Sequence, residues 1–258
     1  EETVADPALS ILHITDTHLF AAADERLRGV DTGRSLQAVL QAASTGPQPV
    51  DGVLATGDLS QDESAGAYRR FRELLEPLAA PVWCLPGNHD APERLAATLA
   101  GPPFQVGGAV LRGGWALLLL DSCMPGDHGG RLSAAQLAWL AAALEEHRQR
   151  HVLIALHHHV LPLQSRWLDE LGLYNAAELL QVIDRAPQLR AVVAGHVHQA
   201  SDILRNGVRF LTTPSTCFQF LPQVASFAVD RRPPGYRWLE LHADGRLETE
   251  VAWIEPPQ

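Results

Sequence analysis

The fold is indicated first by the segment Leu9-Ser10-Ile11-Leu12-His13-Ile14-Thr15-Asp16-Thr17-His18. Its apolar part has the length and composition of a buried β-strand, and polar Asp16 and His18 follow at once. The same succession, an apolar run and then Asp, Asn or His, recurs four times. The four are Val53-Leu54-Ala55-Thr56 before Gly57-Asp58, Val82-Trp83-Cys84-Leu85 before Gly87-Asn88-His89-Asp90, Val152-Leu153-Ile154-Ala155-Leu156 before His157-His158-His159, and Ala191-Val192-Val193-Ala194 before Gly195-His196-Val197-His198. Because ligands in open α/β sheets bind at the carboxyl ends of strands, we expect these polar side chains to meet in one crevice.

Helical patterns lie between these strands. They cover residues 35–43, 65–78, 93–99 and 133–147, and a fifth begins at Asn175. Ser133, three residues before Gln136, has the spacing of a capping box, and Asn175 before Glu178 is a related arrangement. A further apolar run, residues 115–120, predicts another strand. Alternation of strands and helices indicates a largely parallel sheet in this part of the chain.

The C-terminal quarter predicts antiparallel structure. Asn206-Gly207 lies between apolar runs, and so does Asp244-Gly245. Both dipeptides are strong hairpin signals when apolar runs flank them. We therefore expect C-terminal β-hairpins and, for the whole chain, an α/β sandwich with sheets inside and helices outside.

A length of 258 residues and a hydrophobic content of 46% fit a single domain spanning residues 1–258. The longest apolar stretch is only strand-sized, so no membrane span is expected. Residues 1–10 are acidic and lack the layout of a secretory signal, and the missing initiator Met suggests a trimmed chain. Three widely spaced cysteines, Cys84, Cys123 and Cys217, argue against a disulfide framework and suit a reducing cytoplasm.

The charge of the chain limits its partners. The formal net charge is -10, and all 20 basic residues are Arg. The absence of Lys excludes a Lys Schiff base, a phosphate loop with its Lys and a Lys general base. Without a dense basic cluster, a nucleic-acid polymer has no electrostatic footprint here. An anionic substrate must be attracted locally, which bound metal cations can do.

The polar residues at the strand ends form a ligand set for metal ions. Asp and His suit Zn, Mn and Fe, and residues two apart on an extended strand, such as Asp16 and His18, share a face. A carboxylate such as Asp58 can bridge two ions, whereas Asn88 offers a neutral and weaker oxygen ligand. No Cys joins these clusters, which argues against a structural zinc site. The set therefore predicts two ions in one site and metal-assisted hydrolysis.

The order of the motifs resembles that of the calcineurin-like metallophosphoesterases, and further segments narrow the resemblance to the class III bacterial 3′,5′-cyclic AMP phosphodiesterases. These segments are Thr15-Asp16-Thr17-His18-Leu19-Phe20, Ala55-Thr56-Gly57-Asp58-Leu59-Ser60-Gln61-Asp62, Leu156-His157-His158-His159, Trp167-Leu168-Asp169, Thr213-Pro214-Ser215-Thr216-Cys217 and Leu239-Glu240-Leu241-His242-Ala243-Asp244-Gly245. The resemblance extends from about Leu9 to Trp253. It implies the metallophosphoesterase fold, a four-layer α-β-β-α sandwich.

The resemblance also implies which residues hold the ions. One ion would be held by Asp16, His18, Asp58 and His198, and the second by Asp58, Asn88, His157 and His196. Asp58 would bridge them together with a hydroxide. His89 is left without a metal and would face the phosphate, as a charge stabiliser or as an acid for the leaving oxygen, and Asn88 completes the implied catalytic pair. The residues expected beside the nucleotide phosphate are His18, Asp58, Asn88, His89 and His198.

The implied reaction is hydrolysis of 3′,5′-cyclic AMP to 5′-AMP, with the bridging hydroxide attacking phosphorus in line with the 3′-oxygen. Fe and Mn are the expected metals and Zn is the alternative, because the ligand set suits all three. The implied partner is a small cyclic nucleotide rather than a nucleic-acid polymer or a membrane, and the implied location is the bacterial cytoplasm. The C-terminal β region is a candidate homodimer surface.

Several alternatives stay open in the sequence. A broader phosphodiesterase acting on 2′,3′-cyclic nucleotides or glycerophosphodiesters needs the same metal core, and a metal-binding scaffold without activity could keep the fold. His157 is favoured as a ligand over His158 and His159, whose roles are open. Asp62 and Asp90 are either groups that orient the ligands or turn-forming residues. The histidines expected to be structural or solvated are His13, His128, His147, His151 and His242.

Overall fold

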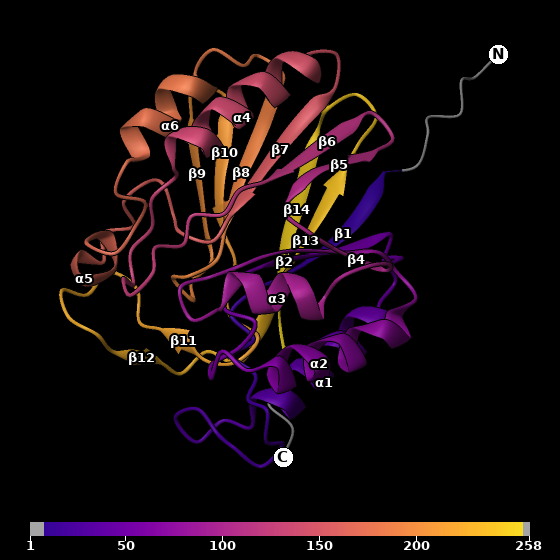
Figure 1. Ribbon diagram of the computed structural model, residues 1–258, viewed down its shortest axis with the longest axis vertical. Helices are drawn as coiled ribbons and strands as arrows, with labels where there is room; N and C mark the ends of the chain where they lie inside the picture. The colour runs from indigo at the N-terminus through magenta and orange to yellow at the C-terminus, as the bar shows by residue number, and fades with distance from the viewer. Residues whose placement is uncertain (1–7, 255–258) are drawn as a thin grey trace.

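Two β-sheets packed face to face, with helices on both outer sides, make up the computed structural model, which describes residues 8–254 (Figure 1). The expected α-β-β-α layering is therefore confirmed. Most of the acidic N-terminal segment interpreted above, residues 1–7, lies outside the described residues, and so do residues 255–258.

The first sheet runs in the order β14-β13-β1-β2-β3-β4. Its strands are β1 (Leu9–Ile14), β2 (Gly52–Thr56), β3 (Val82–Leu85), β4 (Phe104–Val106), β13 (Gly235–Leu241) and β14 (Leu247–Trp253). β1 to β4 are parallel, whereas β13 pairs antiparallel with both β1 and β14. The carboxyl ends of β1, β2 and β3 consequently lie at one edge.

The second sheet runs in the order β5-β6-β7-β8-β10-β9. Its strands are β5 (Gly108–Arg112), β6 (Trp115–Leu119), β7 (His151–Leu156), β8 (Leu189–Ala194), β9 (Ser201–Arg205) and β10 (Val208–Thr212). β6, β7, β8 and β10 are parallel, and β5 and β9 are antiparallel edge strands. A separate two-stranded ribbon is formed by β11 (Gln219–Phe220) and β12 (Val229–Asp230).

The helices are α1 (Thr32–Thr45), α2 (Ala65–Leu75), the 3₁₀ turn η1 (Glu76–Leu78), α3 (Pro92–Thr98), α4 (Ala134–Glu146), α5 (Arg166–Asp169) and α6 (Ala176–Ile183). The short α5 lies beside the β11–β12 ribbon, and the longer helices form the two outer layers (Figure 1). α1, α2 and α3 lie against the first sheet, and α4 and α6 lie against the second (Figure 1). Within residues 8–254, no helix combines the length and the apolar character that a membrane span requires.

Three apolar cores separate the four layers, and the side-chain alternation of the strands explains them. In β1, Leu12 and Ile14 point to the core under α1 and α2, while Ile11 points to the core between the sheets. In β7, Val152 and Ile154 face α4 and α6, while Leu153 faces the other sheet. Both faces of each central strand are covered, which is why these strands appear in the sequence as nearly continuous apolar runs.

The sequence expectations for the strands are confirmed to within two residues at each end. Both hairpins are also confirmed, with Asn206, Gly207 and Gly245 at positive φ. The β9–β10 hairpin belongs to the second sheet and the β13–β14 hairpin to the first, so the two do not form one antiparallel region. The helix expected over 65–78 ends earlier, at Leu75, because Pro77 lies in the 3₁₀ turn that follows. The helix expected to open at Asn175 does so, with Asn175 as the N-cap residue of α6. Its side chain caps no backbone N–H of the helix, however, and bonds to both backbone groups of Leu132 instead.

Arg237 on β13 joins the two sheets. Its guanidinium donates to the carbonyls of Ser201 and Thr212, at 3.1 and 2.9 Å, and to the hydroxyls of Thr213 and Thr249. Only 3% of the residue is exposed, and burial lowers its pKa to about 10. A buried cation satisfied by carbonyls and hydroxyls therefore adds a polar connection to the apolar core between the two sheets.

We predict that Arg237→Ala lowers the free energy of unfolding by about 2–4 kcal/mol, because buried carbonyls lose a charged donor. Urea denaturation measures this loss. The matched control is Arg148→Ala, whose side chain is 66% exposed and should change stability by less than about 0.5 kcal/mol. Equal stability of the two variants would contradict the role of Arg237 as an inter-sheet connection.

Candidate dinuclear metal centre

The backbone bends sharply at most of the predicted ligand positions. Five of these residues adopt the left-handed conformation that non-glycine residues rarely take. They are Asp16 (φ 53°), His18 (φ 47°), Asp58 (φ 50°), His196 (φ 69°) and His198 (φ 45°). Such positions cost free energy and persist where surrounding structure fixes them, which is typical of functional sites.

Glycines allow the strand ends to approach each other. A Cβ on Gly57, which has φ 92°, would lie 2.6 Å from the backbone nitrogen of Gly87 and 2.7 Å from Nδ1 of His157. A Cβ on Gly195 would lie 2.7 Å from Oδ2 of Asp16. The glycine that precedes the ligand residue in these motifs is therefore explained by close packing of the loops.

One group of side chains gathers Asp16, His18 and His198. Oδ1 of Asp16 lies 3.2 Å from Nε2 of His198 and 3.8 Å from Nε2 of His18. The two Nε2 atoms lie 3.1 Å apart. The other oxygen of Asp16 accepts hydrogen bonds from the hydroxyl of Thr15 and the backbone of His196, so that Oδ1 alone faces the histidines.

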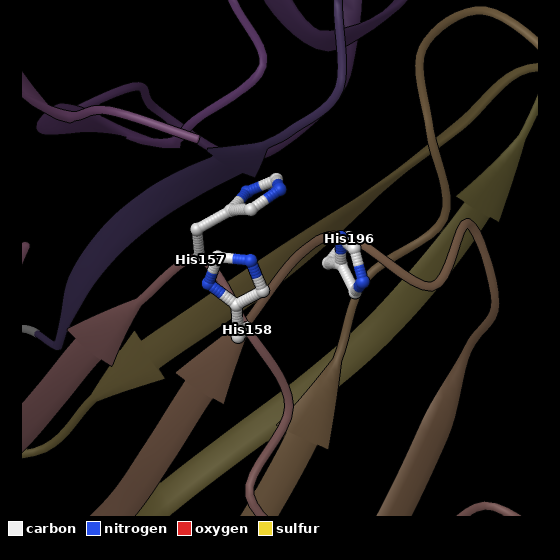
Figure 2. Close-up of side chains that lie close together, drawn as sticks. All are labelled: His157, His158 and His196. Atoms are coloured by element: carbon white, nitrogen blue, oxygen red, sulfur yellow. The ribbon is translucent and has the colours of Figure 1, made fainter. Parts of the chain in front are cut away.

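A second group gathers Asn88, His157 and His196. Oδ1 of Asn88 lies 3.1 Å from Nε2 of His157 and 3.0 Å from Nδ1 of His196. Figure 2 shows His157 and His196 approaching each other from the ends of neighbouring strands of the second sheet. Nδ2 of Asn88 lies 3.2 Å from Nδ1 of His128, and this contact turns the amide oxygen of Asn88 toward the group.

Asp58 lies between the two groups. Its Oδ2 is 3.9 Å from Nε2 of His18 in the first group and 3.5 Å from Nε2 of His157 in the second. Its Oδ1 accepts a hydrogen bond of 2.8 Å from the backbone nitrogen of His89. Burial alone would raise the pKa of Asp58, but His157 and His18 outweigh it and hold the pKa well below its usual range. A single carboxylate oxygen thus faces both groups.

The donor set fits two cations. Nδ1 of His157 donates to the carbonyl of Thr56, and Nδ1 of His198 donates to the carbonyl of Phe218, both at 2.7 Å. When these two rings are neutral, the Nε2 atom of each carries a free lone pair and faces the site. Oδ1 of Asp16, although buried, accepts no hydrogen bond from the described residues. Burial lowers the pKa of His157, yet the charge of Asp58 outweighs burial and raises it to about 9, so the site itself attracts positive charge.

His158 and His159 are held by other contacts. The ring of His158, which lies beside His157 in Figure 2, has Nδ1 2.8 Å from the hydroxyl of Ser122 and Nε2 3.1 Å from the carbonyl of His128. Burial, and then the neighbouring His157, lower its pKa to about 3. Nε2 of His159 lies 3.4 Å from Asp169. Although His158 is close enough to His157 and His196 to count as a third donor, both its nitrogens are engaged, which favours His157.

His89 lies beside the two groups without joining them. Its ring is edge-on to that of His18, with centroids 5.4 Å apart, and is partly exposed in the cavity. The ring of His128 also lies near it, with centroids 5.7 Å apart. The sequence favoured a surface role for His128. Its side chain is exposed on the rim of the cavity, where it contacts Asn88.

Asp90 fixes the two loops that carry Asp58 and Asn88. It accepts hydrogen bonds from the backbones of Leu59, Ser60 and Gly87, and from the hydroxyl of Tyr68. Burial, and then the charge of Asp58, raise its pKa to about 7. Asp62 accepts bonds from Ser60 and Ser64 in its own turn and also from the backbone nitrogen of Ala21, so it both forms a turn and connects that turn to the segment after His18.

The segment Thr213-Pro214-Ser215 forms hydrogen bonds with β1 and with Asp16 directly after it, a role that the sequence alone did not reveal. The hydroxyl of Ser215 donates to the carbonyl of Asp16 at 2.8 Å. Thr213 lies 2.8 Å from Nδ1 of His13, whose pKa burial lowers to about 3. His13 is thus the structural histidine that the sequence predicted, neutral and placed between two threonine hydroxyls.

The chain is similar in sequence to known phosphoesterases. The family model described as calcineurin-like phosphoesterase matches residues 9–200. The chain is 42% identical to the 3′,5′-cyclic adenosine monophosphate phosphodiesterase CpdA of Pseudomonas aeruginosa, over 97% of the chain and 92% of that protein. It is 46% identical to the protein of the same name from Escherichia coli K12, over 93% and 88%.

Solved structures show the same fold. A dimetal phosphatase from Danio rerio superposes with a TM-score of 0.67 at 18% identity, covering 97% of this chain and 100% of the other. At that identity the likeness concerns the fold alone. The family assignment rests on the matched residues 9–200 and on the relatives that align with almost the whole chain. The chain belongs to the calcineurin-like phosphoesterase family.

Proposed function

We propose that the protein hydrolyses 3′,5′-cyclic AMP to 5′-AMP at a dinuclear metal site, as a single domain. The observation that carries the proposal is the position of Asp58, whose one oxygen faces two separate groups of nitrogen and oxygen donors. The relatives named as cyclic AMP phosphodiesterases support the choice of substrate, because they align with most of the chain. Action in the bacterial cytoplasm is part of the proposal, supported by three unpaired cysteines.

In this proposal each ion has three donors of its own and shares Asp58 with the other. The first would be held by Asp16, His18, Asp58 and His198, and the second by Asp58, Asn88, His157 and His196. Bound ions would lower the pKa of water and neutralise the charge of the phosphodiester. Fe and Mn are our proposed metals, with Zn as the alternative, because imidazole and carboxylate donors suit them all.

The chain's own residues position the substrate and move a proton. Because its backbone is tied to Asp58 and its ring is partly exposed in the cavity, His89 faces the phosphate and protonates the departing 3′-oxygen. The amide of Asn88 fixes one side of the phosphate site, oriented by His128. His18, Asp58 and His198 complete the wall next to the phosphate.

A substrate panel tests the proposed function. We predict that kcat/KM is highest for 3′,5′-cyclic AMP among 3′,5′-cyclic GMP, 2′,3′-cyclic AMP and an artificial diester, measured with defined metal. Chelation should abolish all activity, and added Mn or Fe should restore it. A preference for the 2′,3′-cyclic or artificial diester would instead favour a broader phosphodiesterase, and absence of hydrolysis with both ions bound would favour a scaffold.

We further predict that His89→Ala keeps both ions but lowers kcat by about 10²–10⁴-fold, because the proton donor is lost and the metal donors are not. Metal analysis and steady-state kinetics on the same preparation measure the two quantities. His147→Ala, at the end of α4, is the control and should retain both. A fall in metal content in His89→Ala would show that His89 acts through the metals.

A further inference from the structure

The cavity beside the candidate metal centre has a volume of 370 Å³ and two chemically different ends. Small-molecule sites commonly measure about 300–1,000 Å³, so this cavity suits a single small ligand. One end is formed by the residues described above. The other end is apolar and aromatic, and the proposed chemistry does not use it. Its lining includes Leu27, Arg28, Trp167, Phe218, Phe220 and Phe227.

Three segments far apart in the sequence build this aromatic end. Trp167 lies on α5, Phe220 and Phe227 lie on and after β11, and Arg28 precedes α1. Figure 1 shows α5 beside the β11–β12 ribbon at the same side of the sheets. The rings of Trp167, Phe220 and Phe227 contact one another edge-to-face, with centroids 5.0–5.5 Å apart and interplanar angles of 71–74°.

The aromatic end is continuous with the metal end. The ring of Phe220 stacks on His198 with centroids 4.1 Å apart and planes within 15°. The carbonyl of Phe218 accepts the Nδ1 hydrogen of the same histidine. A ligand with its anionic group beside His198 therefore has an apolar, aromatic surface within reach of its remaining part.

Two side chains of the aromatic end, Arg28 and Phe227, are exposed. Phe227 is 42% exposed although its ring contacts Trp167 and Phe220. The guanidinium of Arg28 lies over its ring, 4.4 Å from the centroid, and takes part in no ion pair among residues 8–254. A planar cation over an exposed ring offers a flat surface on which another π system can pack.

We propose that Trp167, Phe220, Phe227 and Arg28 hold the planar base of the nucleotide whose phosphate lies beside the histidines. This inference rests on the proposed function and adds to it the residues that select for a base. Stacking on aromatic side chains is tolerant of base identity, because every base has a π face. The aromatic end therefore favours nucleotides over small diesters that lack a base, while discrimination among bases depends on other contacts.

The test compares two substrates in Phe227→Ala. We expect KM for 3′,5′-cyclic AMP to rise about tenfold with little change in kcat, because base stacking is lost and the chemistry is not. The ratio of kcat/KM for cyclic AMP to that for ribose 3′,5′-cyclic phosphate, which has no base, should fall about tenfold. Leu221→Ala is the matched control, since Leu221 directly follows β11, is 38% exposed and is not among the residues that line the cavity. An unchanged ratio in Phe227→Ala overturns the inference.

A binding measurement separates this inference from the proposed function. Saturation-transfer NMR with adenosine, which carries the base but no phosphate, should show transfer to the base protons in the unaltered protein. The transfer should fall in Phe227→Ala and in Trp167→Ala, and persist in Leu221→Ala. Saturation transfer to adenosine without hydrolysis of cyclic AMP would support the base site and overturn the proposed function. Hydrolysis of cyclic AMP without transfer to adenosine would support the proposed function and overturn the base site.

Discussion

The carboxylate of Asp58 is the constraint on which the site depends. One of its oxygens faces donors from both sheets, and the other is fixed by the backbone of His89. Burying a carboxylate beside a second one, Asp16, is costly unless positive charge compensates both. Without an ion the histidines take up that charge, as the raised pKa of His157 indicates. The same arrangement gives two metal ions a shared ligand.

The fold maintains this arrangement by placing strand ends of two sheets against each other. Left-handed backbone at Asp16, Asp58 and His196 bends the chain directly after the strands, at the edge where their carboxyl ends meet. The free energy stored in those conformations is offset by contacts behind the site. Asp90 ties two loops of the first sheet together, and Arg237 fastens that sheet to the second. The positions of the donors therefore follow from how the two sheets are stacked.

Much of this was predictable from the sequence, because strand ends and hairpin dipeptides are local signals. The strands ending before Asp16, Asp58 and His157 were located within two residues, and the donors after them do lie together. The choice among the three consecutive histidines was harder, since Ser122 and the carbonyl of His128 fix the ring of His158 from elsewhere in the chain.

The aromatic end of the cavity was not predicted. Its position depends on the path of the segment after β10, for which no periodic pattern exists. One signal was present, because Phe218, Phe220 and Phe227 are three of only seven Phe residues in the chain and lie within ten positions. Short elements such as α5 and β11 are also too brief for periodicity to reveal.

The central claim is that Asp58 joins two metal sites into one. It is tested most directly by the metal content of Asp58→Ala after loading with Mn, measured by elemental analysis beside the unaltered protein and Asp244→Ala, an exposed control carboxylate. We expect about two ions per chain in the unaltered protein and in the control, and near-complete loss of both in Asp58→Ala. A folded Asp58→Ala protein that still holds two ions would contradict it.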